Sequence, residues 1–165
     1  MARKLEDRVT VPPLEPVFDV RAKVGPPIEI GPVGRGRRRI VPILGGHCHG
    51  RDAFGELLTG RVLPGGADWQ LIHEDGLTEA DARYTLETMR GALVYVQNRG
   101  VRHAAPGVIE KLLAGEAVDP SLVYFCSAPI FETSAPELQF LVRAIFVGVG
   151  ARYPAEVVIR FWKVG

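Results

Sequence analysis

The sharpest concentration of chemically active side chains is the run His47, Cys48 and His49. An extended backbone places His47 and His49 on one face of a strand and Cys48 on the other. A neutral imidazole is the commonest metal ligand, and it also carries protons near neutral pH. Two functional interpretations stay open: a metal site completed by His73 or His103, and a general acid or base that needs no metal. The ordinary alternative is a structural or surface role in a loop.

A second group of polar residues falls on two segments that are predicted to be neighbouring strands. On the first segment Asp68 and Trp69 point to opposite faces, and on the second Asp81 and Arg83 share a face opposite Tyr84. Contact with water is the ordinary interpretation of the charged face. The alternative is a carboxylate and a guanidinium inside a barrel, which must be satisfied by each other or by a ligand.

Further candidates lie in the C-terminal half of the chain. Cys126 shares a strand face with Tyr124, and its thiolate needs a nearby base to act as a nucleophile, so a buried inert cysteine is favoured. Glu132 stands in an otherwise apolar segment, where a carboxylate is either paired with an arginine or used as a proton carrier. Plain core is the commoner role of the aromatic residues that would give a ligand flat apolar walls, namely Trp69, Tyr84, Tyr95, Phe125 and Phe131.

Length and composition limit the class of protein. The chain has 165 residues, of which 47% are hydrophobic, enough for one core and one domain. Twenty Lys and Arg balance nineteen Asp and Glu, and the net charge of +1 disfavours binding to nucleic acid or anionic lipid. We expect a cytoplasmic protein without a signal peptide or a membrane span, with both cysteines as free thiols.

The segments that must position these residues are short apolar runs separated by Gly and Pro, which is typical of strands and turns. We predict an N-terminal arm over residues 1–15 and an all-β domain over residues 16–165. One short helix is predicted over residues 106–114, ended by Gly115, and tight turns are predicted at residues 45–46, 74–76 and 98–100. The predicted strands span residues 17–24, 28–30, 40–44, 55–62, 68–73, 79–88, 92–97, 122–127, 130–133, 138–149 and 155–164.

Several motifs in order along the chain resemble the domain of unknown function 3237 family. They include Gly45-Gly46, residues 63–69 (Leu-Pro-Gly-Gly-Ala-Asp-Trp), residues 81–84 (Asp-Ala-Arg-Tyr), and residues 131–133 (Phe-Glu-Thr). The resemblance implies a single closed antiparallel β-barrel similar in shape to allene oxide cyclase and dirigent proteins, often as a homo-oligomer. It also implies a pocket, whose candidate residues are Asp68, Trp69, Arg83, Tyr84 and Glu132. The His-Cys-His run, and Cys126 in place of an arginine, depart from the family pattern.

The favoured function is a cofactor-independent lyase, isomerase or cyclase that moves a proton on a small, aromatic or polyketide-like molecule inside the barrel. His47 or His49 would move the proton, Asp68 would be the opposite partner, and Arg83 with Tyr84 would stabilise oxyanion charge. The alternatives are a non-catalytic small-molecule binding protein, a metal-dependent enzyme using His47 and His49, and a scaffold subunit. We expect no cofactor and a dimer or higher homo-oligomer. The predicted substrate-binding residues are Trp69, Tyr95, Tyr124, Cys126, Phe131 and Glu132.

Overall fold

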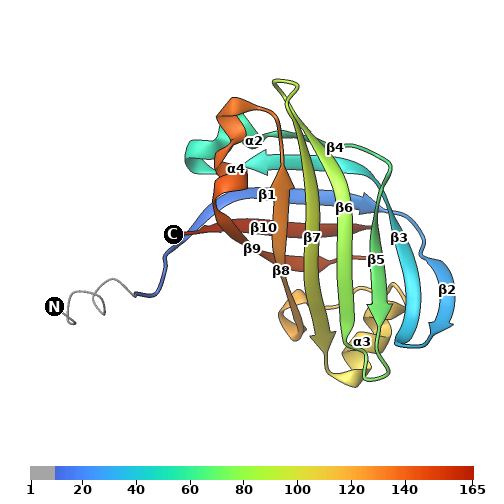
Figure 1. Cartoon of the computed structure of the whole chain (residues 1–165). Helices are drawn as coiled ribbons and strands as arrows, with labels where there is room; N and C mark the ends of the chain where they lie inside the picture. The colour runs from blue at the N-terminus through green and yellow to red at the C-terminus, as the bar shows by residue number, and fades with distance from the viewer. Residues whose placement is uncertain (1–9) are drawn as a thin grey trace.

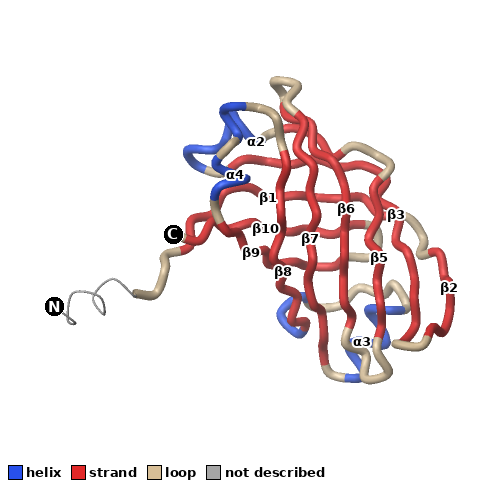
Figure 2. Tube along the Cα trace, in the orientation of Figure 1, coloured by secondary structure: helices blue, strands red, loops and turns tan. Residues whose placement is uncertain are grey.

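A computed structural model describes residues 10–165, and strands make up most of this part of the chain (Figure 2). Residues 1–9 of the predicted arm lie outside the described residues, and the first strand begins at Leu14, so the division into arm and domain stays a prediction. The strands are β1 (Leu14–Val24), β2 (Ile28–Val33), β3 (Gly36–Gly50), β4 (Gly60–Val62), β5 (Gly66–Ile72), β6 (Thr78–Thr88), β7 (Leu93–Ala104), β8 (Val123–Glu132), β9 (Ile145–Arg152) and β10 (Glu156–Val164).

The ten strands of residues 10–165 form one antiparallel sheet that closes on itself (Figure 1). Their order is β1-β10-β9-β8-β7-β6-β4-β3-β2, and β1 also pairs with β3. Along β3, the strands β1 and β2 follow one another on one side, and β4 and β5 on the other. The wall therefore has eight strand positions. The predicted all-β class and single closed antiparallel barrel are confirmed.

Short helices cover the two ends of the barrel (Figure 1). At one end lies α3 (Pro106–Leu113), which confirms the predicted helix and is followed by Gly115 in the left-handed region (φ +81°). At the other end lie α2 (Gly55–Leu58) and α4 (Phe140–Arg143), which directly follow the 3-10 turns η1 (Asp52–Phe54) and η3 (Pro136–Leu138). A third 3-10 turn, η2 (Pro120–Leu122), precedes β8. No helix among residues 10–165 is long and apolar enough to cross a membrane.

The prediction of strands over residues 55–62 and 138–149 is wrong at the points where α2, η3 and α4 form. Leu58, Leu138 and Leu141 are fully buried there, and the rings of Phe54 and Phe140 lie 5.1 Å apart. A short apolar run fits a buried strand and a buried helical turn equally well, so periodicity does not separate them. Helical turns form here because they bury these three leucine side chains across the end of the barrel.

Two predicted turns are instead continuous strand. Gly45 and Gly46 lie inside β3 with φ of +135° and +137°, and residues 98–100 lie inside β7. A Cβ on Gly46 would overlap the carbonyl oxygen of Arg21 on β1, so only glycine allows β1 and β3 to approach and close the barrel. Glycine therefore bends a long strand here rather than ending it.

The barrel interior has two halves. In the half near α2 and α4, phenylalanine rings pack against one another with centroids 4.8–5.7 Å apart, and each buried ring contributes roughly 1.5–3 kcal/mol of stability. In the half near α3 the inward side chains of β6 are the small Ala80 and Ala82. The first half is a packed core and the second leaves room for a site. The four rings belong to Phe18, Phe131, Phe146 and Phe161.

An ionic clasp on the outer wall spans the strands that close the barrel. Arg160 of β10 donates Nε and Nη2 to the two carboxylate oxygens of Asp19 on β1, at 2.8 and 3.1 Å. Arg51, which directly follows β3, donates Nη1 to Asp19 at 2.9 Å. Asp19 therefore ties β1 to both of its neighbours in the wall.

Replacing Asp19 by asparagine should lower the free energy of unfolding by about 1 kcal/mol at neutral pH, the partly exposed arginines limiting the loss. Burial raises the pKa of the Asp19 carboxyl, but Arg160 and Arg51 outweigh burial and the net pKa is lowered from 3.8. A lowered folded-state pKa gives stability that is present above this ordinary value and is lost as pH falls through the folded value. In urea titrations the difference between wild type and Asp19→Asn should shrink below about pH 4, and a difference independent of pH would contradict the clasp.

Candidate functional site

Seven polar side chains from five strands converge in the half of the interior near α3. Six of them line a cavity of about 40 Å³, and the seventh, Arg39, is joined to it through Gln70. Burying a polar group without a hydrogen-bond partner costs free energy, so each donor and acceptor of such a cluster is expected to bond within the protein or to a bound molecule. The seven are Arg39 from β3, Asp68 and Gln70 from β5, Tyr84 from β6, Asn98 and Arg102 from β7, and Arg152 from β9.

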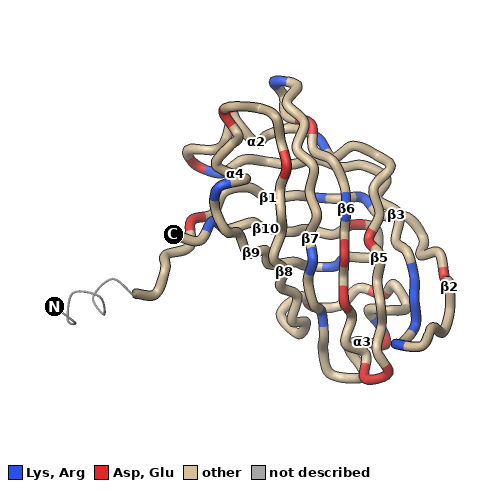
Figure 3. Tube along the Cα trace, in the orientation of Figure 1, with Lys and Arg blue, Asp and Glu red and all other residues tan. Residues whose placement is uncertain are grey.

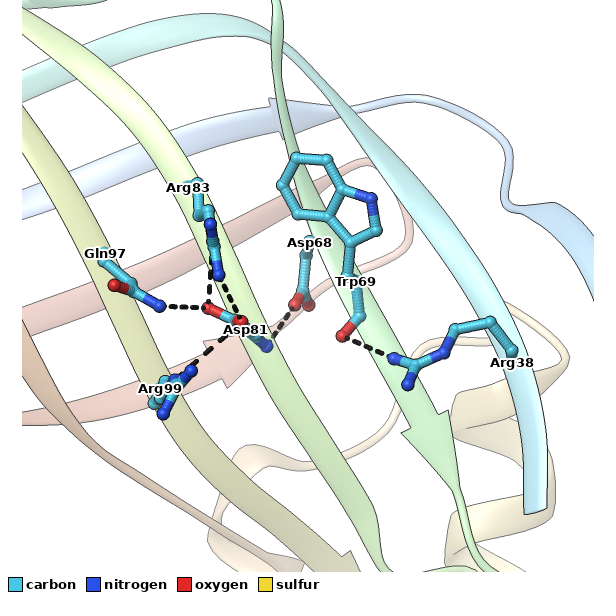
Figure 4. A network of polar contacts seen from close by, with 7 residues as sticks. All are labelled: Arg38, Asp68, Trp69, Asp81, Arg83, Gln97 and Arg99. Carbon is cyan, nitrogen blue, oxygen red and sulfur yellow. Dashed lines mark hydrogen bonds and ion pairs between the residues drawn. The ribbon is translucent and has the colours of Figure 1, made fainter. Parts of the chain in front are cut away.

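Asp68 lies where the pairing between β5 and β6 is interrupted. The register of the two strands skips Trp69 and Gln70, and the Asp68 side chain occupies the break (Figure 4). Its Oδ1 accepts the backbone N–H of Asp81 at 3.0 Å, and its Oδ2 accepts Nε2 of Gln70 at 2.6 Å. Both carboxylate oxygens are thereby held in a fixed direction at the edge of the cavity.

The protonation of Asp68 is set by opposing effects. Burial raises the pKa of its carboxyl, whereas the hydrogen bonds from Gln70 and Asp81 and the charges of Arg102 and Arg39 oppose the rise, and the net pKa is raised. A carboxyl with a raised pKa exchanges its proton more readily near neutral pH than an ordinary aspartate does. The site therefore holds a group suited to proton transfer.

Arg102 is the least satisfied member of the cluster. It is only 2% exposed, it forms no ion pair with any residue in 10–165, and its Nε and Nη2 lack hydrogen-bond partners in the same part of the chain. Its guanidinium carbon lies 5.8 Å from the centroid of the Phe125 ring, a cation–π contact. Burial, with repulsion from Arg39, lowers the pKa of Arg102 to about 10, which still leaves it charged at neutral pH.

The two other arginines of the cluster are bonded within the protein. Arg39 donates Nε to Oε1 of Gln70 at 2.8 Å and Nη1 to the carbonyl oxygen of Leu113, at the end of α3, at 3.4 Å. Arg152 donates Nη1 to the carbonyl oxygen of Glu156 at 3.2 Å. A continuous chain of hydrogen bonds runs from Arg39 through Gln70 to Asp68, so Arg39 orients the proton-carrying carboxyl from a distance.

Tyr84 and Asn98 add two more unpaired groups to the cavity. The hydroxyl of Tyr84 and Oδ1 of Asn98 are buried and have no partner among the described residues. Burial raises the pKa of the Tyr84 hydroxyl, so it stays protonated and can donate a hydrogen bond at neutral pH. With the free edge of Arg102, the cavity therefore offers both donors and an acceptor to a bound molecule.

Apart from the hydroxyl of Ser127, the remainder of the cavity wall is apolar, and it includes the ring of Phe125. Ala80, Ala82, Gly100 and Ser127 face the cavity where larger side chains would fill it. Opposite them the wall is aliphatic, and a molecule in the cavity would therefore meet a polar end and an apolar side. The aliphatic residues are Val20, Ala22, Val24, Val41, Ile43, Val157 and Ile159.

Three of the sequence-predicted site residues face the interior. Asp68 and Tyr84 line the cavity, as strand alternation permits for each of them. Phe131 is buried too, but it belongs to the cluster of aromatic rings in the other half of the barrel. The structure thus brings Asp68 and Tyr84 together and separates Phe131 from them.

The other eight predicted site residues were expected to face the same interior, but they lie on the outer wall. Trp69 is 38% and Tyr124 50% exposed, and the ring of Tyr124 stacks on His103 at 4.9 Å. The physical reason is the two-residue period of a strand: a residue next to an inward-facing one must point outward. The eight are His47, His49, Trp69, Arg83, Tyr95, Tyr124, Cys126 and Glu132.

The histidine pair shows the same alternation. His47 and His49 are exposed, whereas Cys48 between them is buried inside the barrel, and burial raises the pKa of the Cys48 thiol to about 11. Residues 10–165 contain no group of three or more His, Cys, Asp and Glu side chains placed to hold a metal ion. Both cysteines are free thiols, as expected.

Arg83 belongs to an outer network centred on Asp81. Asp81 accepts Nη2 of Arg83 at 3.1 Å and Nε2 of Gln97 at 3.1 Å, and Arg99 lies 3.8 Å away (Figure 4). Acidic and basic positions lie side by side on β6 and β7 in this region (Figure 3). Asp81 and Arg83 pair with each other, but on the outer face and not inside the barrel, so Arg83 is not placed to touch a ligand in the cavity.

Several interior residues were not predicted because the segments that contain them have the composition of a turn or of an exposed charged loop. Residues 98–100 look like a turn, yet β7 continues through them, and its alternation sends Asn98, Gly100 and Arg102 inward. In the run Arg37 to Arg39, strand alternation places Arg37 and Arg39 on the same face, and of the three only Arg39, the farthest from the start of β3, is buried. A strand extended through both segments would have revealed these residues, because an inward-facing charge stands out in an otherwise apolar row.

Comparison with known proteins places the chain among uncharacterised proteins. Residues 12–164 match the model of a family described as "Protein of unknown function (DUF3237)". A UPF0311 protein of Rhodopseudomonas palustris is 45% identical over 143 residues, which are 87% of this chain and 90% of that protein. A solved structure of a conserved protein of unknown function from Rhodopseudomonas palustris has a TM-score of 0.89 at 41% identity, covering 95% of this chain and all (100%) of that one.

Two further solved structures agree on the fold. A protein of Acinetobacter baumannii described as β-barrel-like has a TM-score of 0.79 at 36% identity, covering 96% of this chain and 100% of that one. A protein of Penicillium herquei described as an enzyme has a TM-score of 0.68 at 21% identity, covering 96% of this chain and 98% of that one. The second likeness shows the fold alone. The resemblance expected from the motifs is confirmed.

Replacing Tyr84 by phenylalanine should leave the free energy of unfolding unchanged or raise it by up to about 1 kcal/mol, because the hydroxyl removed has no hydrogen-bond partner among residues 10–165. Chemical denaturation of the wild type and Tyr84→Phe without added ligand measures the difference. A loss of more than about 1 kcal/mol would mean that the hydroxyl is hydrogen-bonded within the protein, and would remove it from the groups offered to a ligand.

Proposed function

The chain belongs to the DUF3237 family of proteins of unknown function, and from that premise we propose that it is a cofactor-independent enzyme that moves a proton on a small organic molecule held inside its barrel. The reaction class is that of a lyase, isomerase or cyclase. The single observation that carries the proposal is Asp68, an oriented interior carboxyl with a raised pKa at the wall of a cavity. The reaction class is the one expected from the sequence, but Asp68 takes the proton-transfer role expected of His47 or His49, and Arg102 replaces Arg83 beside Tyr84.

In the proposed reaction Asp68 accepts a proton from carbon and returns it at another position or to a leaving group. Its hydrogen bonds from Gln70 and the Asp81 N–H fix one face of the carboxyl and leave the direction of the cavity for the substrate. Removing a proton from carbon next to a carbonyl group places negative charge on oxygen, which must be stabilised. Tyr84 and Arg102 are the donors available for that oxygen, in the role that the sequence analysis gives to Arg83.

The size of the cavity favours a small aliphatic substrate. An engineered cavity of about 150 Å³ binds benzene, whereas this one has about 40 Å³. A molecule of a few heavy atoms therefore requires less widening of the barrel than an aromatic or polyketide-like one. The surrounding aliphatic wall keeps bulk water from the reacting atoms, which strengthens the electrostatic effect of the polar groups.

The second candidate is a carrier that binds the same molecule without changing it. The unpaired Tyr84, Asn98 and Arg102 favour binding and do not by themselves require a reaction. The fold shared with the Penicillium herquei protein is compatible with an enzyme but assigns no reaction to this chain. A cytoplasmic location and assembly into a homo-oligomer stay predictions.

Proton transfer can be tested without knowing the natural substrate. Small ketones and keto acids incubated with the protein in D₂O should exchange hydrogen for deuterium at carbon, which proton NMR detects. Asp68→Asn should reduce the exchange rate by at least about a hundredfold, because the side-chain amide cannot accept the proton. Saturation-transfer NMR on the same samples reports whether the compound still binds.

A matched control variant is Asp75→Asn, in the exposed turn that joins β5 to β6, where Asp75 accepts only the backbone N–H of Leu77. It should exchange deuterium at the wild-type rate. Binding without exchange in the wild-type protein would select the carrier instead, and exchange that survives Asp68→Asn would remove Asp68 as the proton carrier.

A further inference from the structure

We infer that the interior site recognises its substrate by a carboxylate group, gripped by the free edge of Arg102, so that the substrate is a small aliphatic carboxylic acid. This inference rests on the proposed function, since it concerns the same cavity, but it is tested by binding and not by turnover. It goes beyond proton transfer because it names the group that holds the substrate in place.

The geometry of Arg102 carries the inference. Nε and Nη2, which are buried and lack partners among the described residues, form one edge of the guanidinium, and their N–H bonds point in the same direction. The same edge grips carboxylates elsewhere in this protein: Arg160 binds Asp19 through Nε and Nη2, and Arg83 binds Asp81 through the same pair of atoms. Arg102 therefore presents the same pair of nitrogens that holds a carboxylate at two places on the outer wall, here without a carboxylate of the described residues bound to it.

The charges around the cavity point to an anion. Arg39, Arg102 and Arg152 stand against Asp68 alone in the polar cluster, so positive charge is in excess even when the carboxyl of Asp68 is ionised. Arg39 and Arg152 have partners in the protein, whereas Arg102 keeps a full edge free. Leaving a buried cation unpaired costs several kcal/mol, and a bound anion would offset this cost.

The rest of the lining selects an organic acid over an inorganic anion. A carboxylic acid bound to Arg102 would place its hydrocarbon chain against the aliphatic wall, whereas a phosphate has no apolar part to place there. A short hydrocarbon chain fits that wall. Tyr84 and Asn98 are then free for a second polar group on the acid, such as the carbonyl or hydroxyl that a proton transfer would act on.

The test is an NMR titration of the uniformly ¹⁵N-labelled full chain with propionate, with its neutral isostere propionamide and with inorganic phosphate. The Nε–H signal of Arg102 is identified by its loss in Arg102→Met. Propionate should shift this signal in a saturable way, and propionamide should bind at least about tenfold more weakly because it lacks the charge. Phosphate should leave the signal unchanged.

Two variants separate the inner arginine from an outer one. Arg102→Met should weaken propionate binding by about 10- to 100-fold, as expected for loss of a charged hydrogen-bond donor pair. Arg83→Met removes the same bidentate edge from the outer wall and should leave affinity within about twofold. Because a buried unpaired cation is unfavourable, Arg102→Met should also keep or raise the melting temperature without ligand.

Each other result overturns the inference. Propionate that binds Arg102→Met as tightly as the wild type, or propionamide that binds as well as propionate, excludes recognition of the carboxylate. A saturable shift with phosphate alone assigns the site to an inorganic anion. A large fall in the melting temperature of Arg102→Met, with no propionate binding to the wild type, makes Arg102 a structural residue. None of these results affects Asp68, whose role is decided by deuterium exchange.

Discussion

The guanidinium of Arg102, held inside a closed barrel with one edge unpaired, is the feature on which the rest of the account depends. In a closed sheet a side chain has only two environments, because successive residues alternate between the interior and the outer wall. A charge sent inward is removed from water and must find its partners within the barrel. Residues 10–165 supply partners for Arg39 and Arg152 but leave Arg102 without them, and an unpaired buried cation is expected where a ligand completes the site.

The division of the interior explains how the fold tolerates such a site. Phenylalanine rings fill the half near α2 and α4, and the apolar area buried there stabilises the barrel independently of the polar half. Toward α3, inward-facing alanine and glycine leave space for the cavity, and the Asp68 side chain lies where the pairing of β5 with β6 is interrupted. The aromatic rings that stabilise the barrel and the polar site proposed to bind a ligand therefore lie in opposite halves of the interior. The Asp19 clasp closes the wall that both ends share.

The fold class followed from the sequence because turn residues recur at short intervals between apolar runs, and because alternation is a local property of a strand. Asp68 was identified on the correct face for the same reason. The interior residues that were missed have one physical origin, which is that local composition does not report how far a strand continues. Gly46 and Asn98 sit in turn-like segments, yet each lies within a long strand because its neighbours in the closed barrel supply the hydrogen bonds. Arg102 was missed as a consequence, and the outward Arg83 received its role.

The central claim is that Arg102 faces the cavity and offers Nε and Nη2 to something that is not part of the chain. A crystal structure at a resolution that shows ordered water would test it most directly. The account predicts electron density for a carboxylate or for water molecules about 3 Å from both nitrogens, with the guanidinium inside the barrel. A guanidinium turned out to bulk solvent, or one whose free edge is paired with a carboxylate of the protein itself, would contradict it.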